Sequence, residues 1–246
     1  MIRDEIGYSH YIRENLFYRD LARRMAPVRD SFVLCQTVKS LETNHPDLIS
    51  TNEFSFLKDR LSIRIEQDLA SFIESSGGFK QVLADITQAG ERINQYCQLR
   101  NGYISIKKGI KRVYRRGSTH FPRIGPQFDM DLFHEYRKIS KYLQFQMEII
   151  QPVYPKLLKA YAGTIDKHTE LMGDIRDYDR LDFYIQNALP KEIPSSTRKK
   201  LLGKIRSQRE DMLLKILSKS QMIYAEKPKE FIKRIKVYWN QYYQLT

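Results

Sequence analysis

The chain has 246 residues, 41% of them hydrophobic and 29% charged, so it can bury a core of its own and needs neither disulfides nor a structural metal to fold. Lys and Arg number 42 against 29 Asp and Glu, and the net charge of +13 favours nucleic acid, an anionic membrane or another polyanion as partner, although a solvated basic surface explains it equally well. No apolar run approaches the roughly 20 residues that span a bilayer, and no signal peptide is recognisable. We therefore expect a cytoplasmic protein in which Cys35 and Cys97 are buried small hydrophobes.

Helical patterns follow one another along the chain, and Gly and Pro mark the breaks between them. In the first half we expect a helix over 8–25 that stops near Pro27, a second helix from Pro27, a loop at 45–47, a helix over 54–73, a break at 75–78 and a long helix toward Asn101. In the second half we expect helices over 103–117, 129–150, 156–187, 195–224 and 227–243, with Asp129 or Asp131 as a cap. No stretch alternates long enough to require a strand, so the sequence predicts an all-α fold.

Two segments of the chain resemble each other. Met, Arg, Asp and Leu occupy matching places in 25–34 and 172–181, where Arg176 follows Arg29 by 147 residues. Two related helical bundles, over residues 1–101 and 102–246, would explain this repeat, and chance similarity between short helical segments is the alternative.

The helix expected over 129–150 separates apolar from basic side chains. Its apolar stripe consists of Leu132, Tyr136, Ile139, Leu143, Met147 and Ile150. The opposite side carries a row at i, i+3, i+4 and i+7 made of His134, Arg137, Lys138 and Lys141. Only Glu148 adds a carboxylate to this side, and each like-charged pair costs a few tenths of a kcal/mol. The row is either kept for an anion or is a solvated helix face.

The helix expected over 103–117 repeats this arrangement 26 residues earlier. Its row consists of Lys108, Lys111, Arg112 and Arg115, opposite Tyr103, Ile106, Ile110 and Val113. A short loop would make the two helices neighbours, and their rows could then hold one extended polyanion. Arg binds phosphate as a bidentate fork and Lys as a mobile point charge, which suits a phosphate chain. Bound phosphate would also favour protonated His134.

Smaller basic sets occur elsewhere in the sequence. Arg19 and Arg23 share one helix face. A further set consists of Lys229, Lys233 and Lys236, which lie opposite Phe231, Ile235, Tyr238 and Tyr242. The run 198–200 is interpreted as a solvated helix start.

Motifs of several enzyme classes are absent from the sequence. It contains no P-loop, no G-x-G-x-x-G turn, no H-E-x-x-H pair and no G-x-S-x-G elbow. Asp174, Asp177 and Asp179 cluster without the other ligands of a calcium loop, so ion pairs with Arg176 and Arg180 are the favoured interpretation. We expect no catalytic residues, no metal and no cofactor.

Several motifs, in order along nearly the whole chain, resemble the CHAD family, the conserved histidine α-helical domain. The segment from His134 to Tyr142 is similar to the family's H-x-x-R-K-x-x-K-Y helix, and 114–117 is similar to its Y-R-R-G helix. Segment 170–177 resembles the L-G-D-x-x-D segment, 224–231 resembles the terminal helix, and 11–15 through Asp30 resembles the first half.

The resemblance implies two antiparallel helical bundles related by a pseudo-twofold axis around a basic central groove or cavity. It implies non-enzymatic binding of inorganic polyphosphate and association with polyphosphate granules. The cations implied as contacts are His134, Arg137, Lys138, Lys141, Lys108, Lys111, Arg112, Arg115, Arg116, Arg19 and Arg23. Some members are fused to a triphosphatase domain with an E-x-E-x-K motif, which this sequence lacks.

The first repeat departs from the family pattern. The offset of the repeat places the counterpart of His134 before Met1, so we expect the chain to lack that His/Arg helix, or to keep a diverged remnant around His10. Two other functions stay open: a nucleic-acid-binding helical protein, for which Phe145 is the aromatic candidate within the main row, and a scaffold whose basic face docks an acidic protein.

Overall fold

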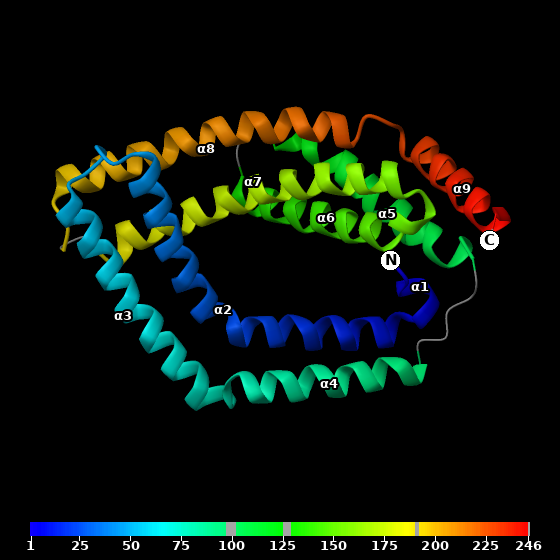
Figure 1. Ribbon diagram of the computed structural model, residues 1–246, viewed down its shortest axis with the longest axis horizontal. Coiled ribbons are helices and arrows are strands. Elements are labelled where there is room, and N and C mark those ends of the chain that lie inside the picture. The colour runs from blue at the N-terminus through cyan, green and yellow to red at the C-terminus, as the bar shows by residue number, and fades with distance from the viewer. Residues whose placement is uncertain (97–101, 125–128, 190–191, 246) are drawn as a thin grey trace. The chain divides into compact units, whose positions relative to one another are not determined.

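The computed structural model describes residues 1–96, 102–124, 129–189 and 192–245, and within these ranges the regular structure is entirely helical (Figure 1). This confirms the predicted all-α class. Two short 3-10 helices, Phe121–Arg123 and Gln151–Val153, flank the sixth α-helix. The α-helices are α1 (Arg3–Ile6), α2 (Tyr8–Asn44), α3 (Thr51–Ser76), α4 (Gly78–Tyr96), α5 (Ile104–His120), α6 (Met130–Ile149), α7 (Pro155–Asn187), α8 (Ser195–Ile223) and α9 (Pro228–Leu245).

Local sequence signals account for several helix ends. The Ser50 hydroxyl accepts from the Glu53 N–H, while the Glu53 carboxylate accepts from the Ser50 N–H at 2.8 Å, so a capping box begins α3. Gly77 ends the same helix in the left-handed conformation, with φ of 69°. Asp129 caps α6, as predicted, by accepting from the Asp131 N–H at 2.8 Å.

The predicted break at Pro27 is wrong. α2 runs unbroken from Tyr8 to Asn44 with Pro27 inside it, and its ribbon bends along its length (Figure 1). Proline removes one backbone hydrogen bond and clashes with the carbonyl four residues earlier, which bends a helix without having to end it. Buried Leu21 before the proline and buried Leu34 after it hold both segments of the helix against the core.

The chain folds into two compact units, and neither is one continuous segment. The first unit comprises Met1–Tyr8, Gln98–Asp174 and Asp211–Thr246, and the second comprises Ser9–Cys97 and Ile175–Glu210. The predicted repeats, 1–101 and 102–246, divide the chain differently. Their boundary residue Asn101 lies outside the described residues, so the repeat stays a prediction.

Buried tyrosines organise the core of the first unit. Tyr114 of α5 stacks on Phe231 of α9 with ring centroids 3.9 Å apart, and its hydroxyl donates to the carbonyl of Glu226 at 3.0 Å. Tyr161 of α7 donates to the carbonyl of Ile223 at 2.6 Å. Carbonyls at the end of a helix lack hydrogen-bond partners within it. These two hydroxyls supply donors to the carbonyls of the turn between α8 and α9. Burial raises the pKa of Tyr114 to about 12.

The second unit packs α2 against α3 and α4. An apolar cluster takes Leu21 from α2, Phe72 from α3 and Val82 from α4. Cys35 is buried, as predicted, whereas Cys97 lies outside the described residues. In the part of the chain that the structure describes, no helix is long and apolar enough to cross a membrane.

The packing of α5 generates a test with two glycines. A Cβ built on buried Gly117 would overlap the phenol ring of Tyr224, whereas one built on exposed Gly163 of α7 meets nothing. We expect Gly117→Ala to lower the free energy of unfolding by about 1–3 kcal/mol through overpacking. Gly163→Ala should raise it by about 0.5–1 kcal/mol, because alanine favours the helix. Urea denaturation measures both, and equal effects would contradict the close approach at Gly117.

Candidate functional site

α5 divides its surface between the core and a dense set of cations. Its buried side consists of Ser105, Ile106, Gly109, Ile110, Val113, Tyr114 and Gly117. The rest of the helix carries six cations and no Asp or Glu: Lys107, Lys108, Lys111, Arg112, Arg115 and Arg116. The predicted row lies opposite the apolar stripe, because residues at this spacing share one helix face.

The cations of α5 differ in whether a carboxylate of the protein already neutralises their charge. Lys107, Lys108, Lys111 and Arg115 are exposed to solvent. Arg112 is half-buried, and its guanidinium lies 3.2 Å from a carboxylate oxygen of Asp4 in α1. Arg116 pairs with Glu135 of α6 at 2.5 Å. The four exposed cations are therefore the part of α5 best suited to an external anion.

The row on α6 is more deeply set and more neutralised. His134, Arg137 and Lys141 are half-buried, and only Lys138 is exposed. Lys138 pairs with Glu135 at 2.5 Å, and Lys141 lies 3.5 Å from Asp166 of α7. From the sequence, only Glu148 was expected on this side of the helix. Glu135 was not predicted as a partner because it lies beside the row, and Asp166 was not because only tertiary structure brings α7 there.

α5 and α6 are neighbours, as predicted, but the contacts of their rows lead to different partners. Arg137 lies against α7, since a Cβ built on Gly173 would come within 3.6 Å of its guanidinium. Lys111 instead faces α9, where it lines a groove with Lys229 and Lys233. A single anion held between the two rows is therefore less well supported than an anion lying along α5.

The predicted cations of α2 are paired with one neighbour. Arg19 and Arg23 are both exposed, and their guanidinium groups lie 3.1 Å and 3.3 Å from the same carboxylate oxygen of Asp20. Exposed pairs of this kind form and break easily, so they leave the cations accessible while reducing their net charge.

A groove of about 350 Å³ between α5 and α9 collects lysines from both helices. Its lining consists of Tyr103, Lys107, Lys111, Lys229, Ile232, Lys233 and Lys236. The lysines of α9 were predicted as a separate, smaller set, because a residue pattern along one helix does not show which other helix lies beside it. On the predicted apolar side of α9, Phe231 and Ile235 are fully buried, whereas Tyr238 and Tyr242 are half-buried; the three lysines are exposed.

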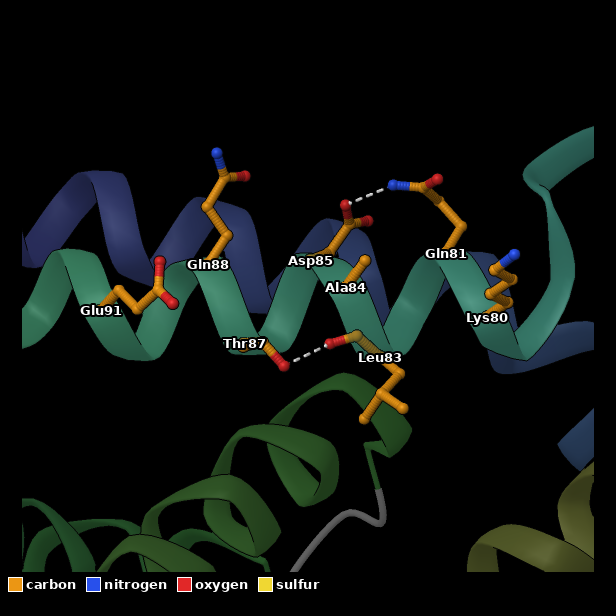
Figure 2. Close-up of a pocket in the computed structure, with 8 residues that line it drawn as sticks. All are labelled: Lys80, Gln81, Leu83, Ala84, Asp85, Thr87, Gln88 and Glu91. Atoms are coloured by element: carbon orange, nitrogen blue, oxygen red, sulfur yellow. Dashed lines mark hydrogen bonds between the residues drawn. The ribbon is translucent and has the colours of Figure 1, made fainter.

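A second hollow, in the second unit, does not suit a polyanion. Its eight lining residues all come from α4, where Gln81 points toward Asp85 and donates to it at 2.8 Å (Figure 2). Asp85 also pairs with Arg24 of α2. Lys80 is the one cation of the lining and stands against the carboxylates of Asp85 and Glu91, so this surface does not attract anions.

Arginines gather around one aspartate in the second unit. Arg180 of α7 pairs with Asp30 of α2 at 2.5 Å, and Arg29 lies 3.9 Å from the same carboxylate. The pKa of Arg176 is lowered, mainly by burial and then by the charge of Arg180. Arg176 and Arg180 were predicted to form ion pairs with the aspartates of this part of α7. Arg180 pairs with Asp30 of α2, and Asp179 of the cluster pairs with Arg209 at 3.6 Å.

No group of His, Cys, Asp and Glu side chains in the described ranges has the geometry to hold a metal ion. This finding concerns residues 1–96, 102–124, 129–189 and 192–245.

A buried chain of hydrogen bonds holds α6 on its inner side, and no residue pattern predicted it. His168 of α7 contacts the Tyr136 hydroxyl through its Nε2 at 3.1 Å, and Tyr136 donates to the Ser220 hydroxyl at 2.7 Å. Ser220 donates in turn to the carbonyl of Ile216 at 2.7 Å. Because the Tyr136 proton goes to Ser220, the Nε2–H of His168 donates to the Tyr136 oxygen. Burial, and then the charge of Lys219, lower the pKa of His168 to about 4.

A family model described as the CHAD domain matches residues 11–186, well over half of the chain. The matched segment contains α5 and α6 with both basic rows, whereas α9 lies beyond it. No curated protein and no solved structure matches the chain.

The buried histidine makes stability depend on pH. Its pKa is about 4 when folded and 6.5 in an unfolded chain, so between these values the unfolded state binds more protons. We expect the free energy of unfolding to fall by a few kcal/mol as the pH drops from about 6.5 to 4. His168→Gln should flatten this slope, measured by urea denaturation across that range. His45→Gln, in the turn after α2, is the control for loss of a histidine; an unchanged slope in His168→Gln would contradict the assignment.

Proposed function

Because the chain belongs to the CHAD family, we propose that it binds inorganic polyphosphate or a similar phosphate polyanion, without catalysing a reaction on it. The observation that carries this proposal is the exposed basic side of α5, a helix with six cations and no carboxylate. A repetitive phosphate chain presents one negative group after another, and a helix face with cations on successive turns matches such a repeat.

The proposed binding residues differ in how much each is expected to contribute to affinity. Lys108, Lys111 and Arg115 carry most of the binding, because they are exposed and their helix has no acidic side chain. Secondary contacts come from cations that must first leave a carboxylate or that lie partly buried: His134, Arg137, Lys138, Lys141, Arg112, Arg116, Arg19 and Arg23. Binding should be driven by charge and counterion release.

The proposal includes the predicted pseudo-twofold repeat and the basic groove or cavity implied by the family. The repeat makes Arg29 and Arg176 equivalent residues. Arg180 pairs with Asp30, the residue after Arg29, so the two similar segments meet within the second unit, as equivalent segments near a pseudo-twofold axis would. Association with polyphosphate granules in the cytoplasm would follow from binding of this kind and is part of the same proposal.

One observation favours nucleic acid as a second candidate ligand. Phe145 of α6 is 51% exposed, and the ammonium of Lys141 lies 5.8 Å from the centre of its ring. An exposed aromatic ring beside a cation is the combination that stacks a base and holds its phosphate. A single exposed ring supports nucleic acid less strongly than the six cations of α5 support polyphosphate, so nucleic acid is the second candidate ligand.

Charge reversal on α5 tests the main proposal. We expect Lys108→Glu with Arg115→Glu to weaken polyphosphate binding by on the order of tenfold or more, and to lower the slope of log K against log salt by about two. The matched control Lys199→Glu with Lys200→Glu changes the charge equally at an exposed site on α8 and should change affinity less than about twofold. Equal losses in both double variants would show that only net charge matters.

A comparison of ligands separates the two candidates. Titration of the chain with long-chain polyphosphate, duplex DNA and single-stranded RNA at one salt concentration should give the tightest binding to polyphosphate. Phe145→Ala should leave that affinity unchanged. Tighter binding of RNA, lost in Phe145→Ala, would assign the surface to nucleic acid instead.

A further inference from the structure

We propose that the face shared by α5 and α9 binds a nucleoside polyphosphate, with its phosphates on the lysines of the groove and its base against Trp239. Nothing in the family match assigns this site, because α9 lies outside the matched residues. The inference does not rest on the proposed binding of polyphosphate.

One face of α9 carries two kinds of side chain in sequence. Lys229, Lys233 and Lys236 occupy its first half, and Trp239 and Tyr243 continue the same face at i+10 and i+14 from Lys229. At 1.5 Å per residue the stripe extends about 20 Å from its first lysine to Tyr243. On this face of α9 the lysines therefore come first and the two aromatic rings follow them.

The lysine end is a built groove. Lys107 and Lys111 of α5 stand across from the lysines of α9, while Ile232 and Tyr103 contribute apolar surface between them. The Tyr103 hydroxyl donates to the carbonyl of Ile232 at 2.7 Å, which fixes α5 and α9 at this spacing. Among the described residues that line the groove there is no carboxylate, so an entering anion supplies the compensating charge.

The aromatic end is a second hollow that shares a wall with the first. It measures about 660 Å³ and is lined by Tyr103, Trp239 and Tyr243, together with Gly102, Asn240 and Gln244. Tyr103 also lines the lysine groove, so the two hollows adjoin. Trp239 is half-buried and Tyr243 is 58% exposed, with their ring centroids 5.0 Å apart. These rings offer stacking surface, and the side-chain amides of Asn240 and Gln244 can pair with the edge of a base.

The segregation of charge and rings selects the class of ligand. Nucleic acids alternate bases and phosphates one to one, and proteins that bind single strands interleave cations with aromatic rings. A nucleoside polyphosphate instead carries one base at one end and several phosphates at the other. Five lysines grouped beside one aromatic hollow match that asymmetry.

Trp239 provides a direct reporter, because it is the one tryptophan of the chain. We expect ATP, titrated without divalent cations, to quench tryptophan fluorescence and to bind about tenfold or more tighter than inorganic tripolyphosphate by calorimetry. Adenosine alone should bind much more weakly than ATP. Equal affinity for ATP and tripolyphosphate with unchanged fluorescence would overturn the proposal.

Substitutions test the aromatic end and the lysine end of the site separately. Trp239→Ala should reduce ATP affinity to that of tripolyphosphate, and Trp239→Phe should preserve most of the preference. Tyr243→Ala, at the more exposed ring, tests the same point if Trp239→Ala does not fold. Lys233→Gln with Lys236→Gln should weaken both ligands, whereas the control Lys199→Gln with Lys200→Gln should weaken neither.

Two outcomes would overturn the proposal even if ATP binds. Unchanged ATP affinity in both Trp239→Ala and Tyr243→Ala would place the base elsewhere. A short single-stranded oligonucleotide that quenches Trp239 at lower concentration than ATP would assign the face to nucleic acid. Because ATP is always compared with tripolyphosphate, the result stands whether or not the chain binds long-chain polyphosphate.

Discussion

The one-sided burial of α5 is the constraint on which the rest of the first unit depends. Tyr114 stacks on Phe231 and donates to the corner between α8 and α9, and Gly117 admits the ring of Tyr224. Successive residues of a helix are rotated by about 100°. When Tyr114 and Gly117 face the core, Lys108, Lys111 and Arg115 therefore face solvent. The packing of the core therefore holds the cations together despite their mutual repulsion.

Compensation of charge distinguishes the surfaces of the molecule. In the second unit, several cations pair with carboxylates on other helices, as in Arg92 with Glu14 at 2.8 Å and Lys58 with Glu42 at 2.7 Å. On α5 the exposed lysines project from a helix without acidic residues. Five lysines of α5 and α9 line one groove, and a local field of this sign draws anions to that face.

Lysine and aromatic side chains give this face two chemical characters. Ammonium groups on flexible stems adapt to phosphates at many spacings, so the exposed side of α5 suits a chain of phosphates. Trp239 and Tyr243 add flat apolar surface at one end, which only a ligand with a ring can use. Lys111 belongs to both surfaces, so phosphates of either ligand would meet the same side chain.

Patterns within single helices were sufficient for much of this description. The all-α class, the cap at Asp129 and the opposition of apolar and basic sides on α5 and α9 follow from interactions among residues that are close in sequence. The family, too, was recognisable from its motifs, and the family model confirms it over residues 11–186. The continuation of α2 through Pro27 was not predictable locally, because burial of distant side chains offset the cost of the proline.

What the tertiary structure alone decided is which helices lie beside one another. From the sequence, the rows containing Lys141 and Lys111 were equally good candidates for binding an anion. In the structure, Asp166 of α7 lies near Lys141, whereas the lysines of α9 lie near Lys111. The chain of hydrogen bonds from His168 through Tyr136 to Ser220 joins residues from three helices, and no residue spacing in the sequence predicts it. Helical periodicity determines which side of a helix carries charge; the packing of separate helices determines which charges are neutralised and which remain open to a ligand.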